Sequence, residues 1–193
     1  MKKLILPLLV AGALAAPSLA QASSNPYVSL SGGLSLANNS SVNGISDFVA
    51  YKTGYAIGGA VGLKMDDVRV EGEIAYHRNN VDTIISVPVT DVNVSLWTFM
   101  ANAYYDVNMK ASSITPYVMG GLGLSHASLN YPGNSESSSQ FAWQLGAGIG
   151  IKASKEVTVD LGYRYLKPSE GDFTGDKVTL GGSKILAGIR YSF

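Results

Sequence analysis

The sequence of 193 residues contains no cysteine, and only 15% of its residues are charged. The absence of cysteine excludes disulfides, thiolate metal sites and thiol catalysis. The charge content is low for a soluble domain. Beyond the N-terminal segment, no apolar run reaches the roughly 18 residues that a transmembrane helix needs. If this chain resides in a membrane, it must therefore cross the bilayer as strands.

The N-terminal segment has the pattern of a secretory signal peptide. Two lysines supply the positive charge, an apolar stretch follows, and small residues then form a cleavage site. We expect residues 1–22 to be the signal peptide, cleaved after Ala20 or Ala22, and residues 23–193 to form one domain. The apolar run is short for the alternative, an N-terminal membrane anchor. Without the two lysines, the 14 basic residues fall to 12 against 14 acidic ones, and this near-neutral balance gives no indication of nucleic-acid binding.

Several stretches alternate with period two, and in each of them the charges fall on one face only. In residues 68–76, one face carries aliphatic and aromatic side chains with one glycine, and the other carries Arg69, Glu71 and Glu73. Residues 157–165 repeat this pattern. Successive side chains of a strand point to opposite faces, and a charge-free face suits lipid better than water. The pattern predicts a barrel whose apolar face points outward.

Eight strands are expected, each near the roughly 9 to 11 residues that cross a bilayer. They lie at residues 27–37, 53–65, 68–78, 92–106, 115–127, 140–152, 157–166 and 183–193. The connections alternate between long (38–52, 79–91, 128–139, 167–182) and short (66–67, 107–114, 153–156). Even-stranded barrels have short turns and both termini on the periplasmic side and long loops outside. We therefore predict an all-β fold, an eight-stranded antiparallel up-and-down transmembrane β-barrel.

A soluble, lipocalin-like barrel with its apolar face inside has the same alternation. Its solvent face would consist mostly of Gly, Ala and Ser, which are poor strand formers. A narrow eight-stranded lumen, in contrast, requires small side chains. The composition of the small-residue face therefore favours the transmembrane alternative.

Five segments resemble the small eight-stranded outer-membrane barrels, a family of opacity-type proteins, bacterial surface antigens and the OmpA membrane domain. The segments are 102–106 (NAYYD), 115–118 (TPYV), 141–148 (FAWQLGAG), 160–165 (DLGYRY) and 187–193 (AGIRYSF). The resemblance implies a monomer in the lipid of the bacterial outer membrane, without a cofactor, that reaches it through periplasmic chaperones and the barrel-assembly machinery. The terminal pattern Ile189, Tyr191 and Phe193 is similar to the family's assembly signal, although a lipid-facing last strand would carry the same side chains.

Two further groups of residues receive physical roles. Six inward-facing charges are expected to form an ion network in the lumen, where pairing makes buried charge tolerable: Arg69, Glu71, Glu73, Asp160, Arg164 and Arg190. Aromatic residues near strand ends are expected to form girdles at the membrane interfaces: Tyr27, Tyr76, Tyr105, Tyr163 and Tyr165, with Tyr191 and Phe193. A gated ion path through the network is the alternative to a plugged interior.

Candidates for catalysis are few. His77 precedes Asp82 and Ser86, and His126 follows Ser125, but no nucleophile motif surrounds either serine. No pair of residues has a recognisable metal-ligand spacing. We predict no enzyme, no metal and no cofactor. The leading hypothesis is a surface-exposed, adhesin- or antigen-like scaffold that contacts a host or surface protein through its loops, and the alternative is a narrow pore for ions or small solutes.

Overall fold

The computed structural model describes residues 24–38, 40–42, 45–84, 87–88, 92–109, 112–131, 134–169, 171–173, 176–179 and 181–193. The expected signal peptide and its cleavage sites lie outside these residues. Among the described residues, no helix is long and apolar enough to cross a membrane.

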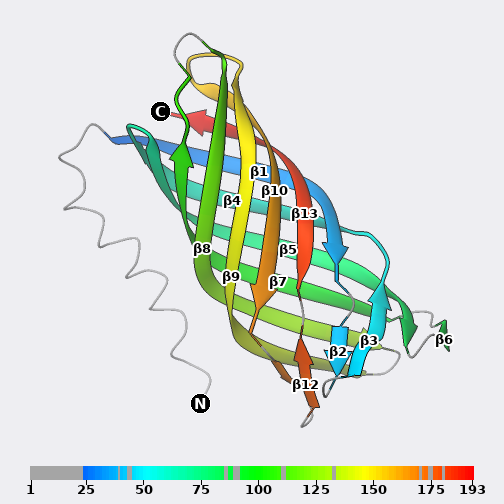
Figure 1. Ribbon diagram of the computed structural model, residues 1–193. Helices are drawn as coiled ribbons and strands as arrows, with labels where there is room; N and C mark the ends of the chain where they lie inside the picture. The colour runs from blue at the N-terminus through cyan, green and yellow to red at the C-terminus, as the bar shows by residue number, and fades with distance from the viewer. Residues whose placement is uncertain are drawn as a thin grey trace.

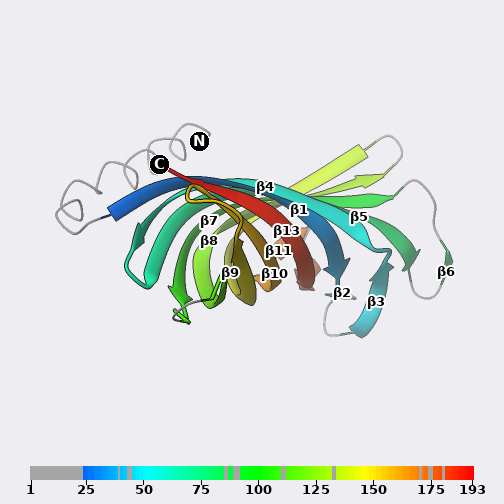
Figure 2. The same cartoon turned by 90° about the horizontal axis from the view of Figure 1, so that it is seen from above.

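Eight long strands close into one antiparallel barrel (Figure 1). They are β1 (Ser24–Ala37), β4 (Gly54–Met65), β5 (Val68–Ile84), β7 (Asn93–Asp106), β8 (Ile114–Tyr131), β9 (Asn134–Lys152), β10 (Val157–Pro168) and β13 (Gly182–Ser192). Each pairs with its neighbours along the chain, and β1 pairs with β13 to close the wall. Figure 2 shows the strands wrapping into one curved wall. The predicted fold class is confirmed.

The register places the apolar face outward, as the alternation predicts. Leu30, Ile57 and Val61 are 73%, 59% and 65% exposed, as expected of side chains that face hydrocarbon rather than a protein core. The intervening residues point into the lumen, where Arg69 and Gln144 are only 2% and 1% exposed. The charged face is therefore the interior of the barrel.

Inward glycines make room for large side chains on neighbouring strands. A Cβ at Gly148 would lie 2.5 Å from the Tyr117 hydroxyl, and one at Gly62 would lie 2.5 Å from the Tyr27 ring. Such contacts are far shorter than packed interiors allow. The small-residue face thus accommodates an aromatic and charged filling, which an eight-stranded lumen barely has the width to hold.

The short turns lie at one end of the barrel, together with Ser24 and Phe193 (Figure 1). Asp66 and Asp67 join β4 to β5, and Asp66 has a φ of 51°. Aspartate tolerates this left-handed region better than most residues. The backbone carbonyl of Asp67 also accepts a hydrogen bond from the Asp106 amide at 2.7 Å, which ties this turn to the end of β7. We call this end the inner end and the opposite one the outer end.

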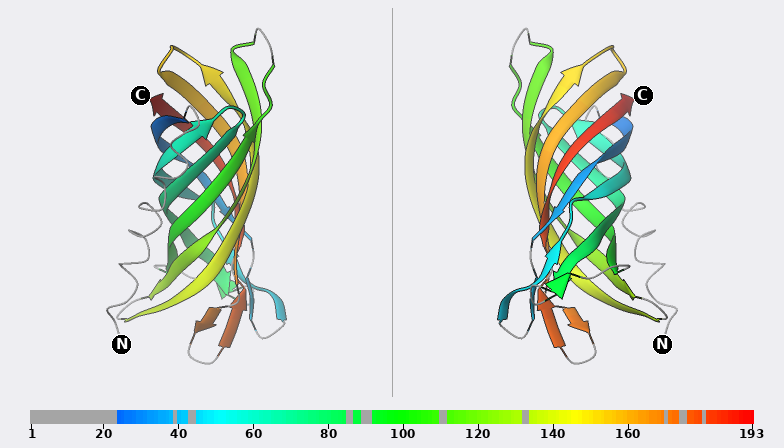
Figure 3. Two further views of the ribbon diagram at one scale, coloured as in Figure 1. Left: turned by 90° about the vertical axis from the view of Figure 1, so that its left-hand side faces the viewer. Right: turned by 90° about the vertical axis from the view of Figure 1, so that its right-hand side faces the viewer.

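At the outer end, the strands run further than expected, and the predicted long connections contain sheet. The additional strands are β2 (Ser40–Val42), β3 (Ile45–Tyr51), β6 (Val87–Pro88), β11 (Gly171–Phe173) and β12 (Asp176–Thr179). The order β11-β12-β2-β3-β5 forms a small sheet that continues the barrel wall, and Figure 3 shows part of it beyond the barrel.

The predicted loop over residues 128–139 is the clearest correction. It is mostly a ladder between β8 and β9, in register from Ser128↔Ser137 to Tyr131↔Asn134. Sequence periodicity identifies strands by one apolar face, and a hairpin outside the bilayer does not need such a face. The Ser- and Asn-rich composition therefore gave the wrong prediction of a loop.

Candidate functional site

The inner third of the lumen contains a cluster of charges around Asp106. Arg69 Nε donates to Asp106 Oδ1 at 3.0 Å, Arg69 Nη2 lies at ion-pair distance from the same oxygen, 2.9 Å, and Lys64 Nζ lies 2.6 Å from Oδ2. The same guanidinium stacks over the Tyr104 ring, 4.2 Å from its centroid. One carboxylate thus contacts one fully buried and one half-buried cation, and the ring covers the guanidinium face.

A second ion pair lies on the other side of the barrel. Arg190 Nη2 on β13 donates to Asp160 Oδ1 on β10 at 3.1 Å. These strands are neighbours in the wall, so the pair bridges two adjacent strands and does not cross the lumen. The Arg190 guanidinium also lies over the Tyr27 ring, 5.5 Å from its centroid.

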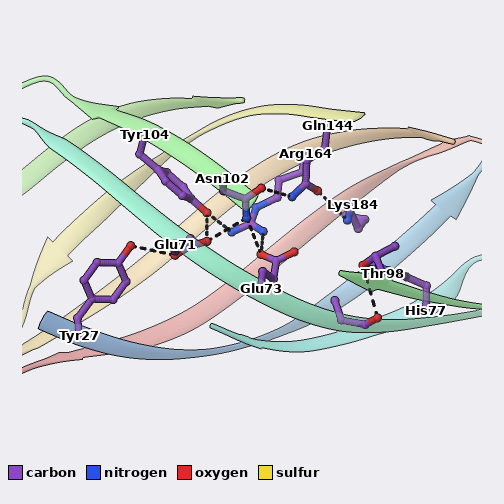
Figure 4. A network of polar contacts seen from close by, with 11 residues as sticks. Tyr27, Glu71, Glu73, His77, Thr98, Asn102, Tyr104, Gln144, Arg164 and Lys184 are labelled. Carbon is purple, nitrogen blue, oxygen red and sulfur yellow. Dashed lines mark hydrogen bonds and ion pairs between the residues drawn. The ribbon is translucent and has the colours of Figure 1, made fainter. Parts of the chain in front are cut away.

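The Glu71 carboxylate sits at the centre of the lumen without a cationic partner within 4.0 Å among the described residues. It accepts hydrogen bonds from the Tyr27 hydroxyl at 2.9 Å, from the Tyr104 hydroxyl and from Asn102 Nδ2 at 3.2 Å. Three neutral donors from β1 and β7 therefore satisfy this buried carboxylate (Figure 4).

Above Glu71, a chain of side-chain contacts crosses the barrel (Figure 4). Arg164 Nη1 on β10 pairs with Glu73 Oε2 on β5. Gln144 Nε2 donates to Asn102 Oδ1 at 2.8 Å, and Lys184 Nζ donates to Gln144 Oε1 at 3.3 Å. Side chains of β5, β7, β9, β10 and β13 thus meet in one layer that fills the middle of the lumen.

The structure places all six residues of the predicted ion network inside the barrel, but it does not join them into one network of opposite charges. There are two separate pairs within the six, one between Glu73 and Arg164 and one between Asp160 and Arg190. Arg69 pairs instead with Asp106, and Glu71 accepts hydrogen bonds from neutral groups. The alternation also predicts Lys64, Gln144 and Lys184 on the inward face, but the predicted network left them out, together with four further inward members: Asn102, Tyr104, Asp106 and Tyr117. For β7, the even-numbered polar residues from 98 to 106 were a usable signal.

An apolar cluster lies in the lumen beyond the polar filling. Met100, Ala142 and Leu166 are buried together, with Leu96 packed against them. One cavity lies on the inner side, between the charged residues and Gly59, Ala60 and Gly188, and another lies at the outer mouth. The side chains between them interrupt the lumen.

One of the expected girdle residues is misplaced. Tyr27 is 2% exposed and points into the lumen, where it binds Glu71. The even-numbered apolar residues of β1, such as Leu30 and Leu34, take the outward face, so the alternation forces Tyr27 inward. The position of Tyr27 near a strand end does not indicate its direction. Whether a residue lies at an odd or an even position of the strand decides which face it takes.

The other expected girdle residues face outward. Tyr105 and Tyr163 are 53% and 51% exposed, and Tyr76 and Tyr165 are partly exposed beside Trp97 and Trp143, with ring centroids 5.0 and 5.8 Å apart. Of the terminal pattern, Ile189, Tyr191 and Phe193 all point outward as well. The Tyr191 and Phe193 rings are in edge contact, 5.3 Å apart.

Neither histidine is placed as a catalytic base among the described residues, and Ser86, one of the two serines considered, lies outside them. His77 is buried in the lumen, with Nε2 3.3 Å from Thr98 Oγ1. His126 faces outward and contacts Ser139 at 2.9 Å, whereas Ser125 points inward. The described residues give His126 no carboxylate to orient it, and they contain no group of three potential metal ligands.

Comparisons with known proteins agree with this fold. The family described as "Outer membrane protein beta-barrel domain" matches residues 6–193. Outer membrane protein PagN of Salmonella typhimurium is 31% identical over 124 residues, which cover 52% of this chain and 51% of PagN. The chain spans about half the length of the curated relatives it matches.

Among solved structures, Neisserial surface protein A aligns with a TM-score of 0.66 at 22% identity, over 87% of this chain and 97% of that one. The N-terminal barrel domain of Pseudomonas aeruginosa OprF aligns with a TM-score of 0.53 at 15% identity, over 88% and 98%. At these identities the likeness concerns the fold. With the match over nearly the whole sequence, the chain belongs to the outer-membrane β-barrel domain family and is a protein of the bacterial outer membrane.

Proposed function

We propose that the protein is a non-enzymatic, surface-exposed scaffold, adhesin- or antigen-like, whose outer connections bind a protein ligand. The observation that carries the proposal is the filled lumen. In its middle, Gln144 donates to Asn102 and Arg164 donates to Tyr104, and an apolar cluster lies beyond them. With the interior occupied in the described residues, the outer end is the part of the barrel available for binding.

The backbone of the outer end supports this role. The order β11-β12-β2-β3-β5 shows that two of the outer connections add strands to a sheet continuous with the barrel strand β5. Binding residues act best on a rigid scaffold. A sheet that continues the barrel wall supplies such a scaffold more readily than a structureless loop.

The charge of the outer connections indicates the class of ligand. They contain seven acidic residues against four basic ones: Asp47, Asp82, Asp91, Glu136, Glu170, Asp172 and Asp176 against Lys52, Arg78, Lys167 and Lys177. An acidic surface disfavours polyanions. The aromatic residues Phe48, Tyr131 and Phe173 of the same connections are candidate contacts to a protein surface.

Replacement of the outer strands tests the proposal. Residues 40–49 and 171–179 would be exchanged for short Gly-Ser linkers, and residues 153–156 of an inner turn would be exchanged as the control. Loss of bacterial adhesion to host cells in the first variant alone, with both barrels still folded, is expected. Adhesion equal to that of the unmodified protein would contradict the proposed adhesin role.

A narrow pore is the rival function. We expect little or no single-channel conductance from the refolded protein in planar bilayers, because the Glu73–Arg164 pair and the contacts of Gln144 with Asn102 and Lys184 cross the described lumen. Steady conductance would contradict the filled lumen and favour the pore. The lipid surroundings, the monomeric state and biogenesis through chaperones and the barrel-assembly machinery belong to the same proposal.

A further inference from the structure

The outer mouth of the lumen contains a small cavity whose lining combines a few polar side chains with a mainly apolar surface. Its lining includes Ser35, His77, Asn79 and Lys184, and the rest is mainly apolar, with Leu96 and Leu166 among it. It offers about 60 Å³ to the centres of water molecules, room for about four of them. A ligand of a few non-hydrogen atoms fits this space.

Among the described residues, Lys184 is a buried cation without an anionic partner within 4.0 Å. It is 3% exposed, and the one hydrogen bond that it makes within the described part of the chain goes to the neutral Oε1 of Gln144. No carboxylate lies within 4.0 Å of its ammonium group among the described residues. Glu73 pairs with Arg164 instead. An ammonium group has three donors, and an unpaired buried charge is costly. The cavity wall therefore has an unfilled requirement for an anion.

His77 adds a second unsatisfied group to the same wall. It is 4% exposed, its Nε2 contacts Thr98 Oγ1, and its Nδ1 has no hydrogen-bond partner in the described part of the chain. In the view of Figure 4, Lys184 stands between Gln144 and the His77–Thr98 pair. Two polar groups that need partners thus line one cavity from strands β13 and β5.

The rim of the cavity is already held in place by other contacts. Ser35 Oγ donates to Asn79 Oδ1 at 2.8 Å, and Asn79 Nδ2 donates to the Ser35 and Lys52 carbonyls at 2.8 and 3.0 Å. These side chains use their polar atoms on each other. Ser35 and Asn79 are therefore engaged, whereas the Lys184 ammonium lacks a carboxylate and His77 Nδ1 lacks a hydrogen-bond partner among the described residues.

We propose that this outer-mouth cavity binds the carboxylate of a small monocarboxylic acid, with the carboxylate on Lys184, a hydrogen bond to His77 and a short alkyl part against the apolar wall. One cation and an apolar surround suit a singly charged group with a short chain better than a multiply charged polyanion. This ligand site is independent of the proposed adhesin- or antigen-like role of the protein.

The test is ligand-observed NMR of propionate with the full chain refolded in detergent micelles at neutral pH. Propionamide, which has the same shape without the charge, is the control ligand. We expect saturation transfer to propionate and none to propionamide. Equal transfer to both ligands, or none to propionate, would overturn the proposal.

Variants locate the binding site. Lys184→Met keeps the length and removes the charge, and it should weaken propionate binding by about tenfold or more, as expected for loss of a charged hydrogen bond. Lys52→Met is the matched control at the same end of the barrel, because the Lys52 side chain is 60% exposed, and it should change binding less than twofold. Val94→Phe, which fills the cavity mouth without altering charge, should also abolish binding. Retention of full affinity in Lys184→Met would refute the assignment.

The carboxylate can come from a free acid or from an acidic side chain of a protein ligand. N-acetyl-glutamate methylamide presents the same propionate group on a peptide backbone and separates the two sources. Tighter binding than propionate assigns a protein side chain, and weaker binding assigns a free acid. In either case, competition between the two probes is expected because they share one site.

Discussion

At the scale of single residues, Asp106 is a buried carboxylate that pairs with two cations. Its carboxylate contacts both Arg69 and Lys64, and the Arg69 side chain is 3% exposed. Removing one partner of a buried pair leaves the other charge without compensation, which is more costly than the pair itself is favourable.

Asp106→Asn should therefore lower the free energy of unfolding by about 3 kcal/mol, measured by urea denaturation in detergent or lipid. Asp82→Asn is the matched control, because the Lys52–Asp82 pair at 3.4 Å is exposed on both sides and such pairs contribute at most about 1 kcal/mol. Equal effects of the two substitutions would show that the Asp106 cluster does not behave as a buried ion pair.

At the scale of elements, the strands depend on glycine where a neighbour sends a large side chain inward. Gly148→Ala on β9 would place a Cβ 2.4 Å from the Leu161 carbonyl oxygen and 2.5 Å from the Tyr117 hydroxyl. Overpacking of this kind costs about 1–3 kcal/mol, and we expect a lower midpoint of thermal unfolding. Gly72→Ala is the control, since its Cβ would meet nothing within 4 Å. A Gly148→Ala protein as stable as Gly72→Ala would contradict the close packing.

The last strand allows a second test at this scale, of the assembly-signal proposal. Deleting Phe193 should reduce the amount of folded protein in the outer membrane, measured by heat-modifiable mobility of membrane fractions. The deletion also removes the hydrogen bond from the Phe193 amide to the Pro26 carbonyl at 3.0 Å, so refolding of the same variant in detergent is the control. Normal refolding with poor assembly in cells supports a signal, whereas unchanged assembly removes that interpretation.

At the scale of the whole molecule, the barrel should contact lipid with one face of every strand. The absence of cysteine allows single-cysteine spin labelling without background. A label at Val61, which is 65% exposed, should be accessible to oxygen dissolved in the bilayer. A label at the neighbouring Ala60, which lines the inner cavity, should be shielded. A reversed pattern would mean that the barrel is inverted.

Much of the fold follows from the sequence because its signal is local. Residues 68–76 alternate regardless of what surrounds them, and turning a charge such as Arg69 toward lipid costs about 2–4 kcal/mol at the bilayer midplane. The facing of β5, β9 and β10 was therefore predictable. The hairpin of β8 and β9 beyond Ser128 was not, because outside the bilayer neither face of a strand must be apolar.

The candidate site was predictable only in part. Alternation indicates that Glu71 and Arg164 face the lumen, but it contains no information about which side chain across the barrel each one meets. The pairing of Arg69 with Asp106 depends on the register between β5 and β7 and on the width of the lumen. The predicted outward position of Tyr27 was wrong for a related reason. Its direction depends on the alternation of all of β1, in which the even-numbered apolar residues face outward.

The sequence by itself determined the number of barrel strands, the lipid-facing side and the acidic balance of the outer connections, because hydrophobic alternation and composition are properties of neighbouring residues. The tertiary structure decided which charges pair, that Glu71 is held by neutral donors, and that Lys184 and His77 line one cavity with unsatisfied polar groups. Closure of the barrel brings strands that are distant in the chain to within side-chain reach, and distances across a closed lumen are not contained in any local pattern.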